Sequence, residues 1–391
     1  MLLLDQALAL LKSEKSPVLN ELVDLQQSLG RVLAADVCSD LDMPPFNKAS
    51  VDGYACRMSD LDKPLMLIET VAAGAVPTKP LLPGQCTKIM TGAKVPDGAD
   101  CVVMVEHTHL DADGKVVVEI LPKKSNIALK AEDIRQGDIV LRKGTLLKAS
   151  HLAVAASVGA TLLTVASKPS ICVFSTGNEL VAPSSKPAEG QIRDANSSQL
   201  LALLQGMQLE AAFGGIIPDR EAETEHMIAA ALQHHDVLLL SGGISMGDFD
   251  YVPRVLHKLG FEIRFKSLAV QPGRPTVFAS SGRQFILALP GNPVSSFNIF
   301  TLLGIPFLYH LMGHDYKPPV VKLPLSEDFV RKNAERQLFV PVSITADGRL
   351  KPLDYHGSAH INAFTDACGL MCIPAGIKEI KAGEPADVRL F

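Results

Sequence analysis

The spacing of apolar residues changes several times along the chain. Near the N-terminus Leu3, Leu4, Leu8 and Leu11 are expected on one face of a short stretch, which predicts an amphipathic helix ending before Pro17. From about residue 62 to 145 the pattern is that of strands and turns, with DADG at 111–114 as a predicted hairpin turn. Helical spacing returns at 149–160. The first half therefore predicts a β-rich region between two helices.

From about residue 168 the chain alternates between buried strands and helices. Four apolar runs each have glycine at or close to their end, and helical stretches separate the earlier ones, which predicts a parallel sheet covered on both faces. A long apolar helix follows, with Asn292 as its expected cap and Pro293 in its first turn. After a linker, short β segments from about 320 to 391 predict a small barrel or sandwich. The four apolar runs are SICVFSTG, LEAAFGGII, DVLLLSGG and RQFILALPG.

Length and composition narrow the class of protein. A chain of 391 residues is expected to form two to four domains, and its net charge of −5 gives no basic surface for nucleic acid. No signal peptide is expected before the first helix, and no apolar run is expected to reach the ~18 residues of a membrane span. The 7 cysteines are scattered, so we expect reduced core residues in the cytoplasm rather than disulfides or a zinc site.

The carboxyl ends of the predicted parallel strands are the expected binding site. Glycine-rich turns at strand ends present backbone N–H groups to anions. Capping of helices is an equal alternative for Asp194 and Asp219, whereas Glu179 and Asp250 sit in strand-end turns that favour function. The candidate binding residues at these ends are Ser175, Thr176, Gly177, Asp194, Asp219, Ser241, Gly242, Gly243, Pro290, Gly291, Asn292 and Pro293.

Acidic side chains beside glycine-rich turns that bind an anion require a cation between the carboxylates and the anion. Magnesium is held by one or two carboxylates and keeps waters and substrate phosphates as further ligands. We therefore predict that Glu179 and Asp250 bind Mg2+, while Arg274 and the helix start at Asn292 hold an anionic substrate. The sequence thus predicts metal-assisted chemistry on a phosphorylated substrate.

Three loops of the first half carry further candidates. Asp52 lies in MPPFNKASVDGYACR, Thr91 in KIMTGAKVPDGAD and Asp133 in KAEDIRQGD. Taken one at a time, each loop is typical of an ordinary exposed turn. Their meaning depends on the motifs in the rest of the chain.

Together the motifs resemble the molybdopterin molybdenumtransferase family along nearly the whole chain. They occur in the family's order and spacing: SVDGYA, MTGA, AEDI, STGNEL, SGGISMGDFDY, QPGRP and PGNPVS. The resemblance implies an elongated multidomain α/β and β protein that forms a homodimer. The implied parts are an N-terminal helix (1–16) packing on the α/β domain, a discontinuous linking domain (17–37 plus 139–167), an inserted β-rich domain (38–138), the α/β molybdopterin-binding domain (168–316) and a C-terminal small β barrel (317–391).

The resemblance also implies a reaction and its residues. Molybdenum from molybdate is inserted into adenylylated molybdopterin with Mg2+, and AMP is released. The implied catalytic residues are Asp52, Thr91, Asp133, Glu179 and Asp250. The family dimer builds its cleft from two subunits, so Asp52 and Thr91 would act in trans, and contact with the molybdopterin adenylyltransferase is an implied partnership.

Departures from the family pattern leave other functions open. Gln271 and Ser267 stand where the family usually has basic residues, and Asn47 replaces an aspartate. Arg264, Lys266 or Arg274 could replace the missing charge. One alternative is a non-catalytic molybdopterin-binding or scaffold protein, which Gln271 and Ser267 favour. Another is a Mg-dependent nucleotide or pyrophosphate hydrolase, which need not carry the DGYA and MTGA loops.

Overall fold

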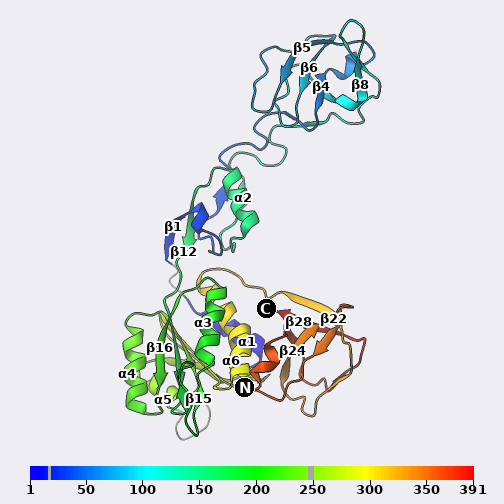
Figure 1. Cartoon of the computed structure of the whole chain (residues 1–391). Coiled ribbons are helices and arrows are strands. Elements are labelled where there is room, and N and C mark those ends of the chain that lie inside the picture. The colour runs from blue at the N-terminus through cyan, green and yellow to red at the C-terminus, as the bar shows by residue number, and fades with distance from the viewer. Residues whose placement is uncertain (16–18, 245–250) are drawn as a thin grey trace.

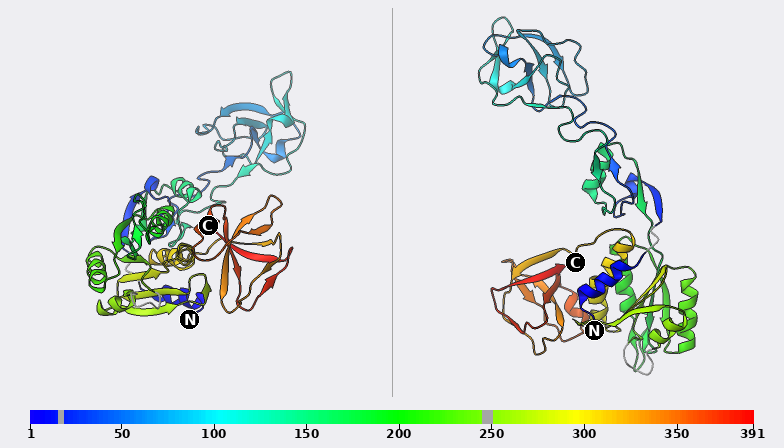
Figure 2. Two further views of the ribbon diagram at one scale, coloured as in Figure 1. Left: turned by 60° about the horizontal axis from the view of Figure 1, so that its bottom comes forward. Right: turned by 180° about the vertical axis from the view of Figure 1, so that it is seen from behind.

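The molecule is elongated, with a β domain at one end and two packed domains at the other. The computed structural model describes residues 1–15, 19–244 and 251–391. Figure 1 shows the inserted β domain separated by a small linking unit from the α/β domain, which lies beside the C-terminal β domain. The same order is seen from behind in Figure 2. The two ends of the molecule are therefore held apart by the linking unit.

The linking unit is made from two stretches far apart in sequence. An antiparallel ladder pairs Leu22 with Thr164, and helix α2 covers one side of it. A second two-stranded ladder leads out toward the β domain, so the chain leaves and returns along paired strands. The elements are β1 (Asn20–Asp24), η1 (Leu25–Gln27), β2 (Val37–Cys38), β11 (Ile139–Leu141), α2 (Ala149–Ser157) and β12 (Leu162–Ala166).

The inserted domain is built on a four-stranded sheet in the order β5-β6-β4-β7. The hairpin expected at 111–114 is present: β8 pairs with β9, and the Asp111 N–H donates to the Lys115 carbonyl (2.9 Å). Gly114 has φ +76°, which a side chain would disfavour. The elements are β3 (Lys48–Ala49), β4 (Gly53–Cys56), η2 (Met58–Asp60), β5 (Met66–Val71), β6 (Gln85–Ile89), β7 (Cys101–Met104), η3 (Val105–His107), β8 (Thr108–Leu110), β9 (Val116–Val118) and β10 (Ile127–Ala128).

The α/β domain has a six-stranded sheet that is parallel in four strands and antiparallel at one edge. The order is β16-β13-β17-β21-β20-β18, and the last three strands alternate in direction. The four strands that the sequence predicts to be parallel, β13, β16, β17 and β21, are parallel, whereas β18 and β20, which it does not predict, add an antiparallel edge. Gly282 and Arg283 alone join β20 to β21, and so short a turn can only make an antiparallel pair. The strands are β13 (Ile171–Thr176), β14 (Leu180–Val181), β15 (Ile192–Arg193), β16 (Ala211–Ile217), β17 (Val237–Ser241), β18 (Glu262–Ser267), β19 (Val270–Gln271), β20 (Pro275–Ser281) and β21 (Gln284–Leu289).

Both faces of this sheet are buried, because alternate residues of each strand enter different cores. In β17, Val237 and Leu239 join the core under α3, whereas Leu238 and Leu240 join the core under α4 and α5. The N-terminal helix α1 adds Leu4 to the first core, so it packs on the α/β domain. The helices are α1 (Leu4–Ser13), α3 (Asn196–Gly206), α4 (Glu221–Leu232) and α5 (Val252–Lys258).

A long apolar helix crosses the first core. It runs from α6 (Pro293–Ile299) through a π-helical turn (Phe300–Gly304) into α7 (Ile305–Leu311). With 19 residues and a mean hydropathy of 1.4, it is long and apolar enough to span a membrane, so the expectation that no such run exists is wrong. In the structure 78% of this apolar stretch is buried inside the protein. Its composition therefore matches a core helix, and its Phe307 ring packs edge-to-face on Phe278 and Phe285 with centroids 5.1 and 5.2 Å apart.

The C-terminal domain completes its sheet with a strand from the α/β domain. Its sheet has the order β19-β24-β26-β28-β22, with β25 also paired to β24. Strand β19 precedes the α/β hairpin in sequence, yet Val270 pairs with Gln337 and Gln271 with Leu338. Phe339 also enters the main α/β core. The elements are β22 (Val320–Pro324), β23 (Phe329–Val330), β24 (Gln337–Ile344), β25 (Leu350–Pro352), η5 (Ile361–Phe364), β26 (Gly369–Ile373), β27 (Glu379–Ile380) and β28 (Pro385–Leu390).

Candidate active site

A cavity of about 740 Å³ lies where the α/β sheet meets the C-terminal domain. This volume falls in the range of small-molecule and cofactor sites. Its walls come from the carboxyl ends of β13, β17 and β21, the loop at 271–275, and a C-terminal loop. The lining residues that sequence had predicted are Thr176, Gly177, Glu179, Asp219, Ser241, Gly242, Gly243, Arg274, Pro290, Gly291 and Asn292.

The glycine turn after β17 lies against the end of β13. Gly242 has φ +97°, and a Cβ atom there would lie 2.8 Å from the Thr176 carbonyl oxygen. The Thr176 hydroxyl donates to the Ser241 carbonyl at 3.4 Å, and the Gly242 N–H donates to the Leu289 carbonyl at 3.0 Å. Glycine is required here by both the backbone conformation and the close approach of the neighbouring strand.

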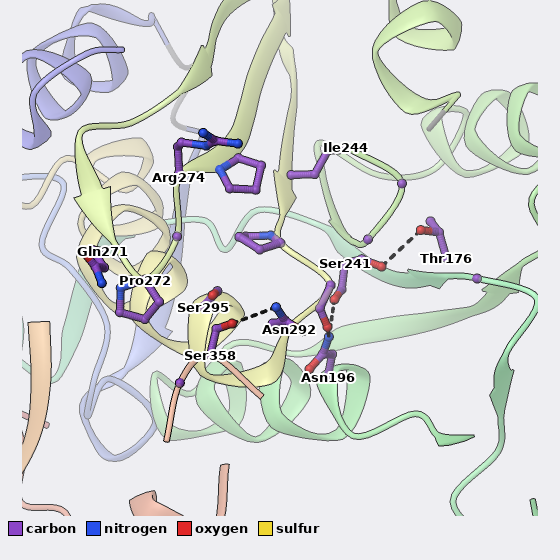
Figure 3. A pocket seen from close by; sticks show the side chains of 18 of the residues that line it. Thr176, Asn196, Ser241, Ile244, Gln271, Pro272, Arg274, Asn292, Ser295 and Ser358 are labelled. Atoms are coloured by element: carbon purple, nitrogen blue, oxygen red, sulfur yellow. Dashed lines mark hydrogen bonds between the residues drawn. The ribbon is translucent and has the colours of Figure 1, made fainter. Parts of the chain in front are cut away.

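Asn196, at the start of α3, connects two other strand ends. Its Nδ2 atom donates to Ser241 Oγ at 2.6 Å and to the Gly291 carbonyl at 2.7 Å. Figure 3 shows this side chain beneath Ser241, on the floor of the pocket. Sequence reasoning missed Asn196, although it stands two residues after Asp194 in the segment it had already considered. These two bonds fix the turn after β17 relative to the turn after β21.

Asp194, Ser175 and Pro293 lie outside the lining of the pocket. Asp194 is buried, and its Oδ1 accepts hydrogen bonds from Ser175 Oγ (2.8 Å) and from the Ser197 N–H at the start of α3 (3.1 Å). The second bond is the helix-capping contact that sequence left open for Asp194. Asp194 therefore joins the end of β13, at Ser175, to the start of α3, outside the lining of the pocket.

Two acidic side chains line the same side of the cavity. Glu179 follows β13 and Asp219 follows β16. The two loops are locked together, because the Asn178 N–H donates to Asp219 Oδ2 and the Asp219 N–H donates to Asn178 Oδ1, both at 3.1 Å. Two carboxylates facing one cavity suit a hydrated Mg2+ that also contacts phosphate. Asp250, the other predicted ligand, lies outside the described residues, and no cluster of three metal-ligating side chains occurs within the described ones.

Two arginines supply positive charge to the described lining of the pocket. Arg274 comes from the loop after β19, and Arg336 comes from the residue before β24. The other two candidates lie elsewhere: Arg264 forms ion pairs with Glu14 (3.1 Å) and Glu262 (2.9 Å), and Lys266 is exposed away from the lining. Sequence reasoning missed Arg336 because its position depends on the β19–β24 pairing.

The C-terminal loop is fixed to the start of α6 through Ser358. The Asn292 Nδ2 atom donates to Ser358 Oγ at 2.8 Å, and the Val294 N–H donates to the Ser358 carbonyl at 3.1 Å. Figure 3 shows Asn292 and Ser358 facing each other. Asn292 is at the N-cap position, but its side chain makes no capping bond, so that expectation is wrong. The amide is instead used to hold the loop.

Asp52, Thr91 and Asp133 lie in the inserted β domain or its connection, not at the pocket of the same chain. Asp52 and Thr91 are brought together: the Thr91 N–H and hydroxyl donate to Asp52 Oδ1 at 2.6 and 2.7 Å. These bonds, the backbone one first, lower the pKa of Asp52. Asp133 is exposed on a separate loop.

The lining also includes residues that strand-end reasoning could not reach. Loop 271–275 adds a turn, and the C-terminal domain adds one complete wall. A glycine-serine turn in DYHGSAH was the available sequence signal for that wall. The additional residues are Leu180, Ile192, Asn196, Ile244, Gln271, Pro272, Gly273, Pro275, Ser295, Arg336, Leu338, Tyr355, Gly357 and Ser358.

Three family models match successive parts of the chain. They are the MoeA N-terminal region (domain I and II) at residues 2–159, a probable molybdopterin binding domain at 172–310, and the MoeA C-terminal region (domain IV) at 322–391. Together they follow the order of the domains described above.

Full-length relatives and structures are also similar. A protein of Staphylococcus epidermidis named molybdopterin molybdenumtransferase is 32% identical, covering 98% of this chain and 94% of its own length. One of the same name from Staphylococcus aureus is 32% identical over 94% of this chain and 90% of its own. Two crystal structures of the molybdopterin biosynthesis MoeA protein from Pyrococcus horikoshii cover 100% of this chain, with TM-scores of 0.86 and 0.80 at 28% and 31% identity, and the chain covers 100% and 99% of theirs. The chain belongs to the molybdopterin molybdenumtransferase family.

Proposed function

We propose that this chain inserts molybdenum from molybdate into adenylylated molybdopterin and releases AMP, in a Mg2+-dependent step of molybdenum cofactor biosynthesis in the cytoplasm. The observation that carries the proposal is the pocket, which combines glycine turns, two carboxylates and two arginines around one cavity. A phosphorylated substrate and a dianion both need positive partners, and carboxylates beside them need a cation. The family assignment supports the same reaction.

The acidic side carries the proposed metal. Glu179 and Asp219 fit a hydrated Mg2+, with Asp250 as a further ligand proposed from the sequence. Bound there, Mg2+ would neutralise phosphate oxygens and help AMP to leave. The residues of the chain hold the substrate: Asn196 fixes the two glycine turns relative to each other, and Arg274 and Arg336, which line the same cavity, attract its anionic groups.

The inserted domain enters the proposal through a second subunit. Asp52 and Thr91 are joined to each other but lie at the far end of the molecule from the pocket (Figure 1). A C2 dimer could bring this end of one subunit to the pocket of the other. We therefore propose a homodimer in which Asp52, Thr91 and Asp133 act in trans, and contact with the adenylyltransferase that supplies the substrate.

AMP release tests the reaction itself. Pure protein given adenylylated molybdopterin, molybdate and Mg2+ should release AMP, and a chelator should stop it. Glu179→Gln should lower the rate by ~10²-fold or more because a metal ligand loses its charge. Glu189→Gln, an exposed change outside the pocket lining, is the matched control. If the wild type releases no AMP above background, the enzyme proposal is contradicted and the non-catalytic molybdopterin-binding or scaffold alternative remains.

Asn196→Leu should slow the reaction and weaken the fold modestly. Losing two hydrogen bonds should lower the free energy of unfolding by about 1–3 kcal/mol, at ~0.5–1.5 kcal/mol each. Turnover should fall by ~10-fold, since two substrate-facing turns lose their connection. Gln199→Leu, one turn along α3, removes a bond to the Pro293 carbonyl (3.2 Å) and should leave turnover near normal. Wild-type turnover in Asn196→Leu would rule out the positioning role.

Mixing two inactive variants tests the shared cleft. Asp52→Ala and Glu179→Ala subunits, exchanged or coexpressed, should recover about a quarter of the wild-type activity, because half of the dimers have one intact cleft. Glu179→Ala mixed with Asp219→Ala should recover none, since both changes affect the same domain. Equal recovery in the two mixtures, or a monomer by light scattering, would contradict an active site shared between subunits.

Gln271→Lys tests the effect of the missing basic residue. Gln271 lines the pocket, so a lysine there should add a charge-assisted bond of ~1.5–3 kcal/mol to molybdate. The molybdate concentration for half-maximal AMP release should fall by ~10- to 100-fold. Gln233→Lys adds the same charge at an exposed site at the C-terminal end of α4, outside the pocket lining, and is the control. Unchanged half-saturation would mean that Arg274 and Arg336 already supply the needed charge.

A further inference from the structure

Tyr355 is the one aromatic side chain among the described residues that line the pocket. It lies on the C-terminal loop between β25 and η5 and is partly buried. The remaining lining is made of glycine, proline, aliphatic and polar side chains. The Tyr355 hydroxyl makes no hydrogen bond to any described residue. A half-exposed ring with a free hydroxyl at a cavity wall is suited to ligand contact rather than to core packing.

The loop that carries Tyr355 is held in place at two points that follow the ring in the chain. Ser358 is bound to Asn292 and Val294 at the start of α6, as described above. Six residues further along, the Phe364 ring packs edge-to-face on Phe297 of α6, with centroids 5.0 Å apart. The wall is therefore positioned by the protein alone, which reduces the ordering cost when a ligand binds.

The charge around Tyr355 suits a heterocycle that carries phosphate. Arg336 and Ser358 line the same wall and offer donors to phosphate oxygens. Burial raises the pKa of Tyr355 to about 12. The phenol therefore keeps its proton at neutral pH and places no negative charge beside a phosphate.

We propose that the Tyr355 ring is the stacking surface for one planar nitrogen heterocycle of the substrate. The inference rests on the proposed function, because adenylylated molybdopterin carries two such rings, adenine and the pterin. Both have the flat π-face that aromatic side chains stack against, without a need for specific hydrogen bonds. Tyr355 is thus a binding residue supplied by the C-terminal domain.

Binding of three probes separates the ring from the phosphate. AMP carries adenine and phosphate, ribose 5-phosphate carries phosphate alone, and neopterin carries the pterin ring alone. Tyr355→Leu should weaken binding of AMP or of neopterin by ~10- to 100-fold, the range of aromatic–base stacking, and leave ribose 5-phosphate unchanged. Tyr355→Phe should restore most of the loss. The ring that responds identifies the heterocycle.

A control and an overturning result define the test. His356→Leu alters the adjacent side chain, which is 71% exposed and outside the lining, and should bind all three probes normally. Equal affinity of wild type and Tyr355→Leu for both AMP and neopterin would overturn the proposal. A wild type that binds neither AMP nor neopterin measurably would also overturn it.

Fluorescence gives an independent readout, because the chain has no tryptophan. Tyr355→Trp introduces a single indole at the proposed wall, and AMP or neopterin should quench it while ribose 5-phosphate should not. Phe213→Trp places the indole on the edge strand β16, 48% exposed and outside the pocket, and should not respond. Equal quenching at both positions would mean that the effect is collisional and would count against stacking.

Failure of this inference can be told apart from failure of the proposed function. If the wild type releases AMP and Tyr355→Leu has unchanged turnover and KM, the proposed reaction is supported and the stacking role of Tyr355 is contradicted. If the protein binds a heterocycle through Tyr355 but releases no AMP, the stacking role is supported and the proposed reaction is contradicted. If both hold, Tyr355→Leu should raise KM for the adenylylated pterin more than it lowers kcat.

Discussion

The pairing of β19 with β24 is the interaction on which the pocket depends. Two residues of the α/β domain, Val270 and Gln271, join the C-terminal sheet as its edge strand, and the Gln337 N–H donates to the Ala269 carbonyl at 3.0 Å. The loop 272–275 follows at once and is therefore held over the strand ends. The same pairing places Arg336 at the pocket. Because Phe339 enters the α/β core, the two domains are also joined by shared apolar packing, and the pocket between them has two fixed walls.

Small polar contacts then set the details within this frame. Asn196 joins two strand-end turns, Asn178 and Asp219 join two others, and Ser358 attaches the C-terminal loop to α6. Each contact connects segments that would otherwise be independent loops. A site of this kind is organised before the substrate binds, which lowers the cost of placing reacting groups. It also explains why several side chains in the pocket contact other protein groups rather than projecting freely.

The sequence predicted the parts of this site that depend on local patterns. Apolar runs ending in glycine located Gly242 and Glu179, because strand ends of a parallel sheet share one edge. It could not place Arg336, whose position follows from a strand pairing between residues 67 apart, or Tyr355, whose loop is held through Ser358. It also assigned Asn292 to helix capping, because the competing partner, Ser358, lies on another domain. The antiparallel edge was missed because the two-residue turn at Gly282 lies between runs that look alike in hydrophobicity.

Charge balance connects the two ends of the elongated chain. Glu179, Asp219, Arg274 and Arg336 line one cavity, so the described lining has no large excess of either sign. At the far end, Thr91 donates twice to one oxygen of Asp52, and the lowered pKa of Asp52 keeps it charged at neutral pH. A third carboxylate brought to this pocket by a second subunit would be repelled by the first two unless a cation lay between them. The proposed Mg2+ beside the glycine turns would therefore also balance the charge of the proposed cleft between subunits.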